Sequence, residues 1–277
     1  MLYVVATPIG NLADLSDRAR QTLASVDLVL AEDTRHSQKL LTQYAIQASL
    51  LSLHEHNEAQ RQTALIDRLQ RGETMALISD AGTPLISDPG YRLVGAAHAA
   101  GIPVRAVPGP SAVIAALSVA GQATDRFVFE GYLSAKPTAR RQRLSELAGE
   151  TRTLVFYETP HRIHAMLADA AAAFGPERDA SLCKELSKQF EQTIRGSLAE
   201  LADWLSVDPK RGQGEFVIII AGDPAALPEA DDPRPLLRGL LRHVPVKTAA
   251  AAVAEVSQYS RNELYKMALA VIKEGDA

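Results

Sequence analysis

The sequence predicts an α/β protein followed by a small helical domain. Short runs of Val, Ile and Leu alternate with longer segments whose apolar residues recur at helical spacing, and this alternation is typical of α/β folds. Several of the runs have no polar face, as expected for strands that helices cover on both sides. No strand pattern follows residue 235, so the end of the chain is expected to be helical.

The predicted elements follow one another from the N-terminus. The strands are Leu2–Val5, Leu28–Ala31, Met75–Ser79, Val104–Val107, Phe127–Glu130, Leu154–Tyr157, Ala180–Cys183 and Phe216–Ala221. Apolar residues spaced three and four apart predict helices between several of these strands. Those helices are Leu40–Tyr44, Ala64–Leu69, Tyr91–Ala99, Ala112–Val119 and Ile163–Ala172.

Two changes in composition predict the domain boundaries. An Ala-rich apolar helix ends in a turn-like stretch after Gly121, so one α/β domain is expected over residues 1–121 and a second over 122–222. Residues 223–235 are rich in Pro and acidic side chains, which is typical of an exposed linker. Residues 236–277 form the predicted tail domain, where Ser260 followed by Glu263 predicts a helix start. Two interpretations of this tail stay open, a helix-turn-helix-like RNA contact and a packing appendage.

Composition narrows the class of protein. The 277 residues include 29 Lys and Arg, 33 Asp and Glu and one Cys, so a disulfide scaffold is excluded and a reducing compartment is expected. No apolar run approaches the roughly 18 residues of a membrane helix, and no basic leader precedes the first strand. We therefore expect a cytoplasmic protein without a membrane contact. A net charge of −4 argues against a general polyanion binder.

Gly- and Pro-rich turns follow several of the predicted strands. In an open α/β sheet ligands bind beyond the carboxyl ends of the strands, so these turns predict a ligand site. The densest is Ser79–Gly90, with two Gly, two Pro and two Asp. The others are Thr7–Leu12, Ala31–Arg35, Pro108–Ala112 and Phe156–Arg162. Helix capping by Asp33, Thr34 or Ser111 is the structural alternative.

Common catalytic and nucleotide motifs are absent. The sequence has no Gly-x-Gly-x-x-Gly after its first strand, no phosphate-binding loop of the ATPase kind, no Ser nucleophile elbow and no Cys-x-x-Cys. Cys183 is expected to be buried. His54 and His56 lack a third ligand, so no metal site is predicted.

Basic residues gather in one part of the chain. Between Arg126 and Arg162 seven Lys and Arg face four Glu, and most of the excess lies in Lys136–Arg143. Such a cluster is typical either of a solvated helix face or of a phosphate-binding edge. Both interpretations stay open.

The order of the loop motifs resembles the tetrapyrrole methylase superfamily, and within it the enzymes that modify ribosomal RNA. The resemblance covers about residues 1–222 and rests on the five turns above together with Lys184-Glu185. It implies two α/β domains with S-adenosylmethionine in the cleft between them, and a homodimer. It further implies 2′-O-methylation of a cytidine ribose in the decoding region of 16S ribosomal RNA, within the small ribosomal subunit. One departure is that superfamily members typically carry Gly-Asp-Pro where this chain has Ser79-Asp80-Ala81.

The resemblance also implies roles for particular residues. The cofactor is expected at Pro8, Ile9, Gly10, Asp80, Ala81, Gly82, Thr83, Ser111, Ala112, Tyr157, Gly214 and Glu215. A ribose hydroxyl is a poor acid, so a base or a nearby cation is needed. The candidates for that role are Lys184, Glu185, Glu158 and His161. The residues expected to hold RNA phosphates are Arg35, Lys136, Arg140, Arg141 and Arg162.

Two other functions fit the same residues. One is a methylase of the same fold that acts on a corrin or porphyrin precursor, which needs no phosphate clamp. The other is a ribosome-binding assembly factor without catalytic activity. His161 at an exposed helix start and Lys184-Glu185 as a surface pair are the structural alternatives to catalysis.

Overall fold

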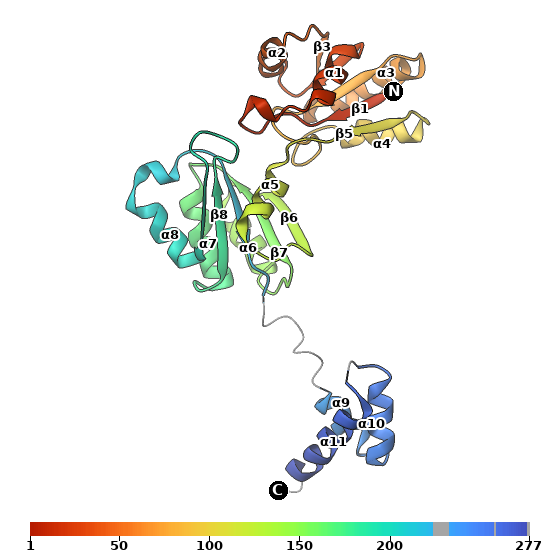
Figure 1. Cartoon of the computed structure of the whole chain (residues 1–277), viewed down its shortest axis with the longest axis vertical. Helices are drawn as coiled ribbons and strands as arrows, with labels where there is room; N and C mark the ends of the chain where they lie inside the picture. Colours follow the sequence, from red (N-terminus) through yellow and green to blue (C-terminus); the bar gives the residue numbers. More distant parts are fainter. Residues whose placement is uncertain (224–232, 258, 276–277) are drawn as a thin grey trace. The chain divides into compact units, whose positions relative to one another are not determined.

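The computed structural model describes residues 1–223, 233–257 and 259–275. The chain divides into two compact units, Met1–Gly222 and Asp223–Ala277. The first unit contains two five-stranded sheets, and the described part of the second contains helices alone (Figure 1). This confirms the α/β class with a helical C-terminal region.

The first sheet is fully parallel, with the strand order β3-β2-β4-β1-β5. Its strands are β1 (Leu2–Val5), β2 (Leu28–Ala31), β3 (Leu50–Ser52), β4 (Met75–Ile78) and β5 (Val104–Val107). Helices are needed on both faces because successive side chains of a buried strand point to opposite sides. In β2, for example, Leu28 and Leu30 enter one apolar cluster, whereas Val29 and Ala31 enter the other.

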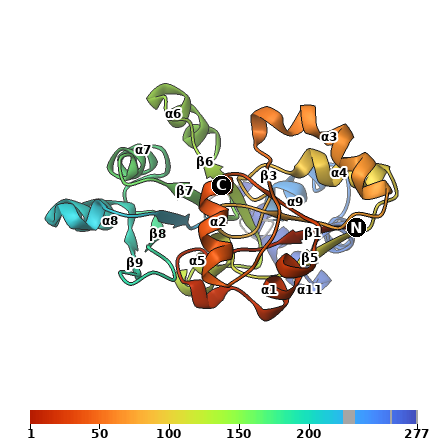
Figure 2. The same cartoon turned by 90° about the horizontal axis from the view of Figure 1, so that it is seen from above.

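Four helices cover these two faces. α3 and α4 pack on one side, and α1 and α2 on the other; Figure 2 shows α3 and α4 opposite α1. The bounds are η1 (Leu12–Asp14), α1 (Asp17–Ser25), α2 (Thr34–Gln43), α3 (Glu55–Gln70) and α4 (Tyr91–Ala99). Asp33 caps α2, accepting hydrogen bonds from the backbone N–H groups of Arg35 and His36, so the capping alternative holds there.

The second sheet is mixed, with the order β6-β7-β10-β8-β9. β6 and β7 are parallel, and all other neighbours are antiparallel. Its strands are β6 (Phe127–Tyr132), β7 (Thr153–Glu158), β8 (Asp179–Lys184), β9 (Gln192–Ser197) and β10 (Phe216–Ile220). The antiparallel pairs bring the end of β8 beside the start of β10, because Lys184 is paired with Phe216.

One face of this sheet packs against α6 (Pro137–Glu146), α7 (Ile163–Phe174) and α8 (Leu198–Val207). The other face packs against α5 (Ala112–Ala120), whose Val113 and Leu117 share a cluster with Val217 and Ile219 of β10. The helix before Gly121 therefore packs on the second sheet. The domain boundary at Gly121 stays a prediction.

Loops from both sheets meet at one edge. Thr7 after β1 pairs with Gly82 after β4 in an isolated bridge, and the Thr83 hydroxyl donates to the Pro110 carbonyl at 2.9 Å. The Ser187 hydroxyl, from the loop after β8, donates to the Asp14 carboxylate. The parallel direction of the first sheet and these contacts place the Gly- and Pro-rich turns around one region.

The second unit contains α9 (Arg234–Leu240), α10 (Val246–Ala254) and α11 (Arg261–Gly275) around a small core that includes Leu237, Val253 and Leu264. The helix start at Ser260 is confirmed: Ser260 N–H donates to the Glu263 carboxylate and Glu263 N–H donates to the Ser260 hydroxyl. α9 begins inside the predicted linker 223–235, of which residues 224–232 lie outside the described residues.

Candidate active site

A cavity lies where the loops of the two sheets meet, and we call it the acidic cavity. Its apolar wall includes Ile9, Ile86, Leu186 and Val217. Among the predicted cofactor residues, nine line it: Ile9, Asp80, Ala81, Gly82, Thr83, Ser111, Ala112, Tyr157 and Glu215. The predicted Pro8, Gly10 and Gly214 are not part of its lining. The structure thus brings most of these residues together, and their contact with a cofactor stays a prediction.

Backbone geometry shapes the loop of residues 79–90 at this cavity. Leu85 and Ser87 have φ angles of 74° and 66°, a left-handed conformation that non-glycine residues rarely adopt. Ser87 also lies against β6, where a Cβ on Gly131 would be 2.9 Å from the Ser87 hydroxyl oxygen. Glycine at position 131, whose φ is 64°, leaves room for this hydroxyl without a shift of the Ser87 side chain. Residues beside a ligand site often have such conformations, because the surrounding packing holds them in place.

The charged side chains lining the cavity are all acidic. They are Asp80, Asp88 and Glu215, and none of the described lining residues is Lys, Arg or His. Burial, together with the charges of Glu32 and Asp80, raises the pKa of Asp88 to about 6, against the lowering effect of a hydrogen bond from Ser79. Burial and the Asp80 charge also raise the pKa of Glu32. The cavity therefore favours a cationic ligand and disfavours an anionic one.

Aromatic rings form another wall. The Tyr132 and Tyr157 ring centroids are 5.4 Å apart, and Phe129 meets Tyr157 edge-on at 4.9 Å. Burial raises the pKa of Tyr157 to about 12, so its phenol is neutral at pH 7. Tyr132 remains 53% exposed, at the mouth of the cavity.

A carboxylate, an ammonium and a second carboxylate close one side of the cavity. Lys188 Nζ lies 2.8 Å from both Glu185 Oε1 and Glu215 Oε2. The N–H of Glu215 donates to Glu185 Oε1 at 2.9 Å. Burial acts to raise the pKa of Glu185, but the Lys188 and Glu215 hydrogen bonds outweigh it and the pKa is lowered. We call this group the Lys188 bridge.

None of the four predicted catalytic residues lines the acidic cavity. Glu158 is buried, and it accepts a hydrogen bond from the Thr159 N–H at 2.7 Å and pairs with Arg162 at 3.2 Å. Lys184 is buried and donates to the Lys210 carbonyl at 2.8 Å. Glu185 belongs to the Lys188 bridge, and His161 is exposed. Their catalytic roles stay predictions.

Asp88 is a lining residue that the sequence analysis did not assign. Its signal was present, because the turn Ser79–Gly90 was singled out for its two aspartates, but only Asp80 received a role. Tyr132, Leu186 and Cys183 were likewise not assigned to the site and line the cavity. Cys183 is fully buried as predicted. Tyr132 lies on β6 and Cys183 lies on β8. Both line the cavity because these strands pack against the loops of the first sheet, and the sequence alone does not show that packing.

Two of the predicted phosphate ligands, Arg140 and Arg162, have partners within the protein, and their RNA contacts stay predictions. Arg140 is 5% exposed and its guanidinium contacts the Asp169 carboxylate at 2.7 Å, inside the helical layer that covers the second sheet. The Arg162 guanidinium donates to the Leu133 carbonyl at 2.6 Å and pairs with Glu158. Both guanidinium groups are engaged within the protein, which argues against a phosphate clamp at either. Arg35, Lys136 and Arg141 are exposed, and their RNA contacts stay predictions.

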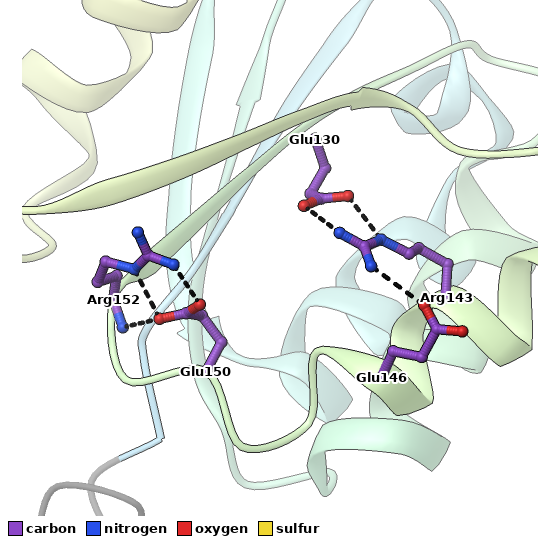
Figure 3. A network of polar contacts seen from close by, with 5 residues as sticks. All are labelled: Glu130, Arg143, Glu146, Glu150 and Arg152. Atoms are coloured by element: carbon purple, nitrogen blue, oxygen red, sulfur yellow. Dashed lines mark hydrogen bonds and ion pairs between the residues drawn. The ribbon is translucent and has the colours of Figure 1, made fainter.

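Two other arginines of the segment Arg126–Arg162, Arg143 and Arg152, also have acidic partners. The Arg143 guanidinium binds Glu130 through two hydrogen bonds and Glu146 through a third, and Arg152 pairs with Glu150 at 2.7 Å (Figure 3). These glutamates were already subtracted in the count along the sequence, and the acids added by the fold are Asp125, which pairs with Arg126, and Asp169, which pairs with Arg140. This arrangement favours the solvated helix face over the phosphate-binding edge for this part of α6.

Comparisons with known proteins agree with this architecture. The family of Tetrapyrrole (Corrin/Porphyrin) Methylases matches residues 1–202, and the RsmI C-terminal HTH domain matches residues 228–271. A solved diphthine synthase has a TM-score of 0.59 at 14% identity, over 80% of this chain and 89% of its own. A uroporphyrin-III-C-methyltransferase from Thermus thermophilus has a TM-score of 0.53 at 20% identity, over 79% and 93%. At these identities the structures show a shared fold alone.

The chain belongs to the tetrapyrrole methylase family, which confirms the fold that the loop motifs predicted. Curated relatives with much higher identity place it within that family. It is 52% identical to the "Ribosomal RNA small subunit methyltransferase I" of Xylella fastidiosa, over 95% of this chain and 97% of that protein. It is 53% identical to the protein of the same name from Pseudomonas aeruginosa, over 97% and 96%. Within the tetrapyrrole methylases, the particular group is therefore that of ribosomal RNA small subunit methyltransferase I.

Proposed function

We propose that this protein uses S-adenosylmethionine to methylate the 2′-hydroxyl of a cytidine ribose in the decoding region of 16S ribosomal RNA. The substrate is the small ribosomal subunit in the cytoplasm, and the homodimer implied by the resemblance stays a prediction. The names of the relatives support the class of RNA. The observation that carries the reaction type is the acidic cavity, whose charged lining residues are Asp80, Asp88 and Glu215.

The lining residues fit this cofactor. S-adenosylmethionine supplies a methyl group activated on a positively charged sulfonium. Of the three lining carboxylates, that of Glu215 is paired with Lys188, and those of Asp80 and Asp88 favour that charge. Ile9, Ala112 and Val217 offer apolar surface to its adenine, and Asp80 can accept hydrogen bonds from its ribose hydroxyls. The backbone of Gly82, with φ at 83°, presents no side chain there.

The chain itself must orient the acceptor oxygen, exclude water and receive a proton. Packed apolar and aromatic walls exclude water. As the ribose oxygen gains the methyl group it loses its proton, and we assign the carboxylate of Asp88 as the group that receives it. Asp88 lines the cavity in a half-buried position, and its pKa of about 6 leaves it ionised at pH 7 but still basic enough to accept a proton.

The test is transfer of labelled methyl from S-adenosylmethionine to small ribosomal subunits that lack their normal methylations. Nuclease digestion and mass analysis of the nucleosides then identify the product, which we expect to be 2′-O-methylcytidine. Cofactor binding without transfer would instead favour a small acceptor of the corrin or porphyrin class. Absence of cofactor binding would favour the assembly factor.

A further inference from the structure

A second cavity lies on the other side of the Lys188 bridge, and we call it the aromatic cavity. Glu185 of the bridge lines it, whereas Glu215 of the bridge lines the acidic cavity. Phe190, Gln192, Lys210, Arg211 and Gln213 are among its other lining residues. The methyl-donor site proposed above does not use these side chains.

Phe190 is exposed on an ordered loop. Its side chain is 68% exposed, although burial of an aromatic ring is normally favourable. The loop of residues 185–191 is fixed by the Lys188 bridge and by the Ser187 N–H, which donates to the Glu191 carboxylate at 2.7 Å. Glu185 and Ser187 both have left-handed φ angles, 52° and 64°. A strained, internally bonded loop thus presents one aromatic ring to solvent, as expected of a preorganised binding surface.

The segment of residues 208–213 lines the same cavity and carries Lys210 and Arg211 beside Asp208. The Lys210 N–H donates a hydrogen bond to the Asp208 carboxylate at 2.9 Å, and Lys184 Nζ donates one to the Lys210 carbonyl at 2.8 Å. Hydrogen bonds to both backbone groups therefore fix the main chain at Lys210. The Arg211 guanidinium lies over the Trp204 ring at 4.8 Å and donates to the Trp204 carbonyl at 2.9 Å. The Lys210 side chain is exposed at the cavity.

These groups together match an unpaired nucleotide. An exposed aromatic ring stacks on a base, amide side chains read base edges, and a lysine contacts phosphate. Gln192 and Gln213 are exposed and supply such amides. The acidic cavity next to it disfavours phosphate. We therefore expect the acidic cavity to take the cationic methyl donor and the aromatic cavity to take the anionic RNA strand, with the Lys188 bridge between the two.

We propose that the aromatic cavity binds an unpaired RNA nucleotide flanking the one that is methylated, with its base on Phe190 and its phosphate at Lys210. This inference rests on the proposed function, because it takes the RNA as substrate. It adds a binding site on the loop before β9 and on the segment before β10, apart from the five residues predicted to hold phosphates.

The experiment measures the Kd of the full-length protein for unmethylated small ribosomal subunits over a range of salt concentrations. Phe190→Ala should raise this Kd about tenfold, the loss of one base stack, and Phe190→Trp should keep the affinity. Lys210→Ala should also raise the Kd and reduce the slope of log Kd against log salt by about 0.7. The Phe190→Ala slope should stay unchanged, because no charge is removed.

Matched controls are Tyr91→Ala, an aromatic that is 64% exposed on α4, and Lys39→Ala, an exposed lysine on α2. Neither should change subunit affinity, and all variants should bind S-adenosylmethionine as the wild type does. Wild-type subunit affinity in Phe190→Ala and Lys210→Ala would overturn the inference, as would an equal loss of cofactor affinity. Methyl transfer by the wild type is measured in a separate assay. If no transfer occurs, the proposed function is contradicted, while the effect of the variants on subunit binding still tests this inference.

Discussion

At the scale of single residues, the carboxyl of Asp88 connects the electrostatics of the site to its chemistry. It lines the acidic cavity near Glu32 and Asp80, and burial is the largest cause of its raised pKa. A carboxyl with an ordinary pKa of 3.8 is a weak base, whereas one near 6 accepts a proton more readily at neutral pH. Its surroundings, more than its residue type, suit it to receive the ribose proton.

Asp88→Asn should lower kcat for methyl transfer about 100-fold, the usual contribution of a general base. In the wild type the rate should fall as the pH drops below about 6, because Asp88 becomes protonated. The variant should lack this limb of the pH profile. Single-turnover methyl transfer between pH 5 and pH 8 measures both effects. A variant with the wild-type rate and the wild-type profile would rule out this role.

The same titration should affect stability. Because the pKa of Asp88 is higher in the folded protein, about 6, than the ordinary 3.8, the unfolded state releases its proton first as the pH rises. The free energy of unfolding should therefore fall by about 1 to 3 kcal/mol between pH 4 and pH 6 and then level off. Urea unfolding of the wild type and Asp88→Asn isolates this contribution, since the variant should lack it. An identical pH dependence in both proteins would contradict the raised pKa.

Arg140 and Arg141 are adjacent in sequence and differ in environment. Arg140→Ala leaves the Asp169 carboxylate, itself 16% exposed, without its partner, so we expect a loss of about 3 kcal/mol of stability. Arg141→Ala removes an exposed side chain and should change stability by less than about 0.5 kcal/mol. Urea denaturation compares the two. Equal stabilities would show that the buried ion pair does not form.

At the scale of elements, the loops that join the two sheets hold the site together. The start of β10 lies beside the end of β8, and the Lys188 bridge fixes the segments that follow and precede them. Gly214 permits this contact. Its φ is 95°, and a Cβ there would lie 2.6 Å from the Glu185 side chain.

Gly214→Ala should therefore displace Glu185, lower stability by about 1 to 2 kcal/mol and weaken S-adenosylmethionine binding. Gly149→Ala is the matched control, because a Cβ added there would meet nothing within 4 Å and its φ is not left-handed. Calorimetric titration of the cofactor and thermal unfolding measure the two effects. Unchanged cofactor affinity in Gly214→Ala would show that Gly214 does not contribute to cofactor binding.

Elements with a uniform apolar pattern were predictable from the sequence, and those defined by pairing were not. β1, β2 and β5 have the predicted bounds. β1 and β2 are short runs without a charged residue that end in turns, and β5 keeps this pattern apart from Arg105. β3 has only three residues, and β9 is a largely exposed edge strand with polar residues such as Gln192 and Arg195. Neither carries a local signal, since each is a strand only through hydrogen bonds to its neighbour.

At the scale of the whole molecule, basic residues gather in the helical segment near the C-terminus. The complete chain has a net charge of −4. Residues 234–275 contain seven Lys and Arg against three Glu, a net charge of +4. The other acidic residues of the second unit stand outside that segment, at 223, 229, 231, 232 and 276, so the whole unit 223–277 has a net charge of −1. The basic helical segment with its own apolar core suits contact with RNA phosphates, and this favours the RNA-contact interpretation of the tail. No helix among the described residues is long and apolar enough to cross a membrane.

A protein ending at Gly222 should bind S-adenosylmethionine with unchanged affinity, because the acidic cavity lies wholly within Met1–Gly222. Its affinity for small subunits should fall and become less dependent on salt, since basic residues are lost. Calorimetry for the cofactor and co-sedimentation with subunits at two salt concentrations check this. Unchanged subunit affinity would restore the interpretation of the tail as a packing appendage.

The sequence by itself determined the α/β class, the turns that surround the site and the family, because these depend on local pattern and motif order. Tertiary structure decided which charges remain available. From the sequence, Arg140 is a basic surface residue, but in the fold it is buried and paired with Asp169 from α7. From the sequence, Asp88 is an ordinary carboxyl, but in the fold burial beside Glu32 and Asp80 raises its pKa. The energy of a charge depends on its solvent exposure and its neighbours. In a folded chain those neighbours come from distant parts of the sequence, such as Glu185 and Glu215 on either side of Lys188.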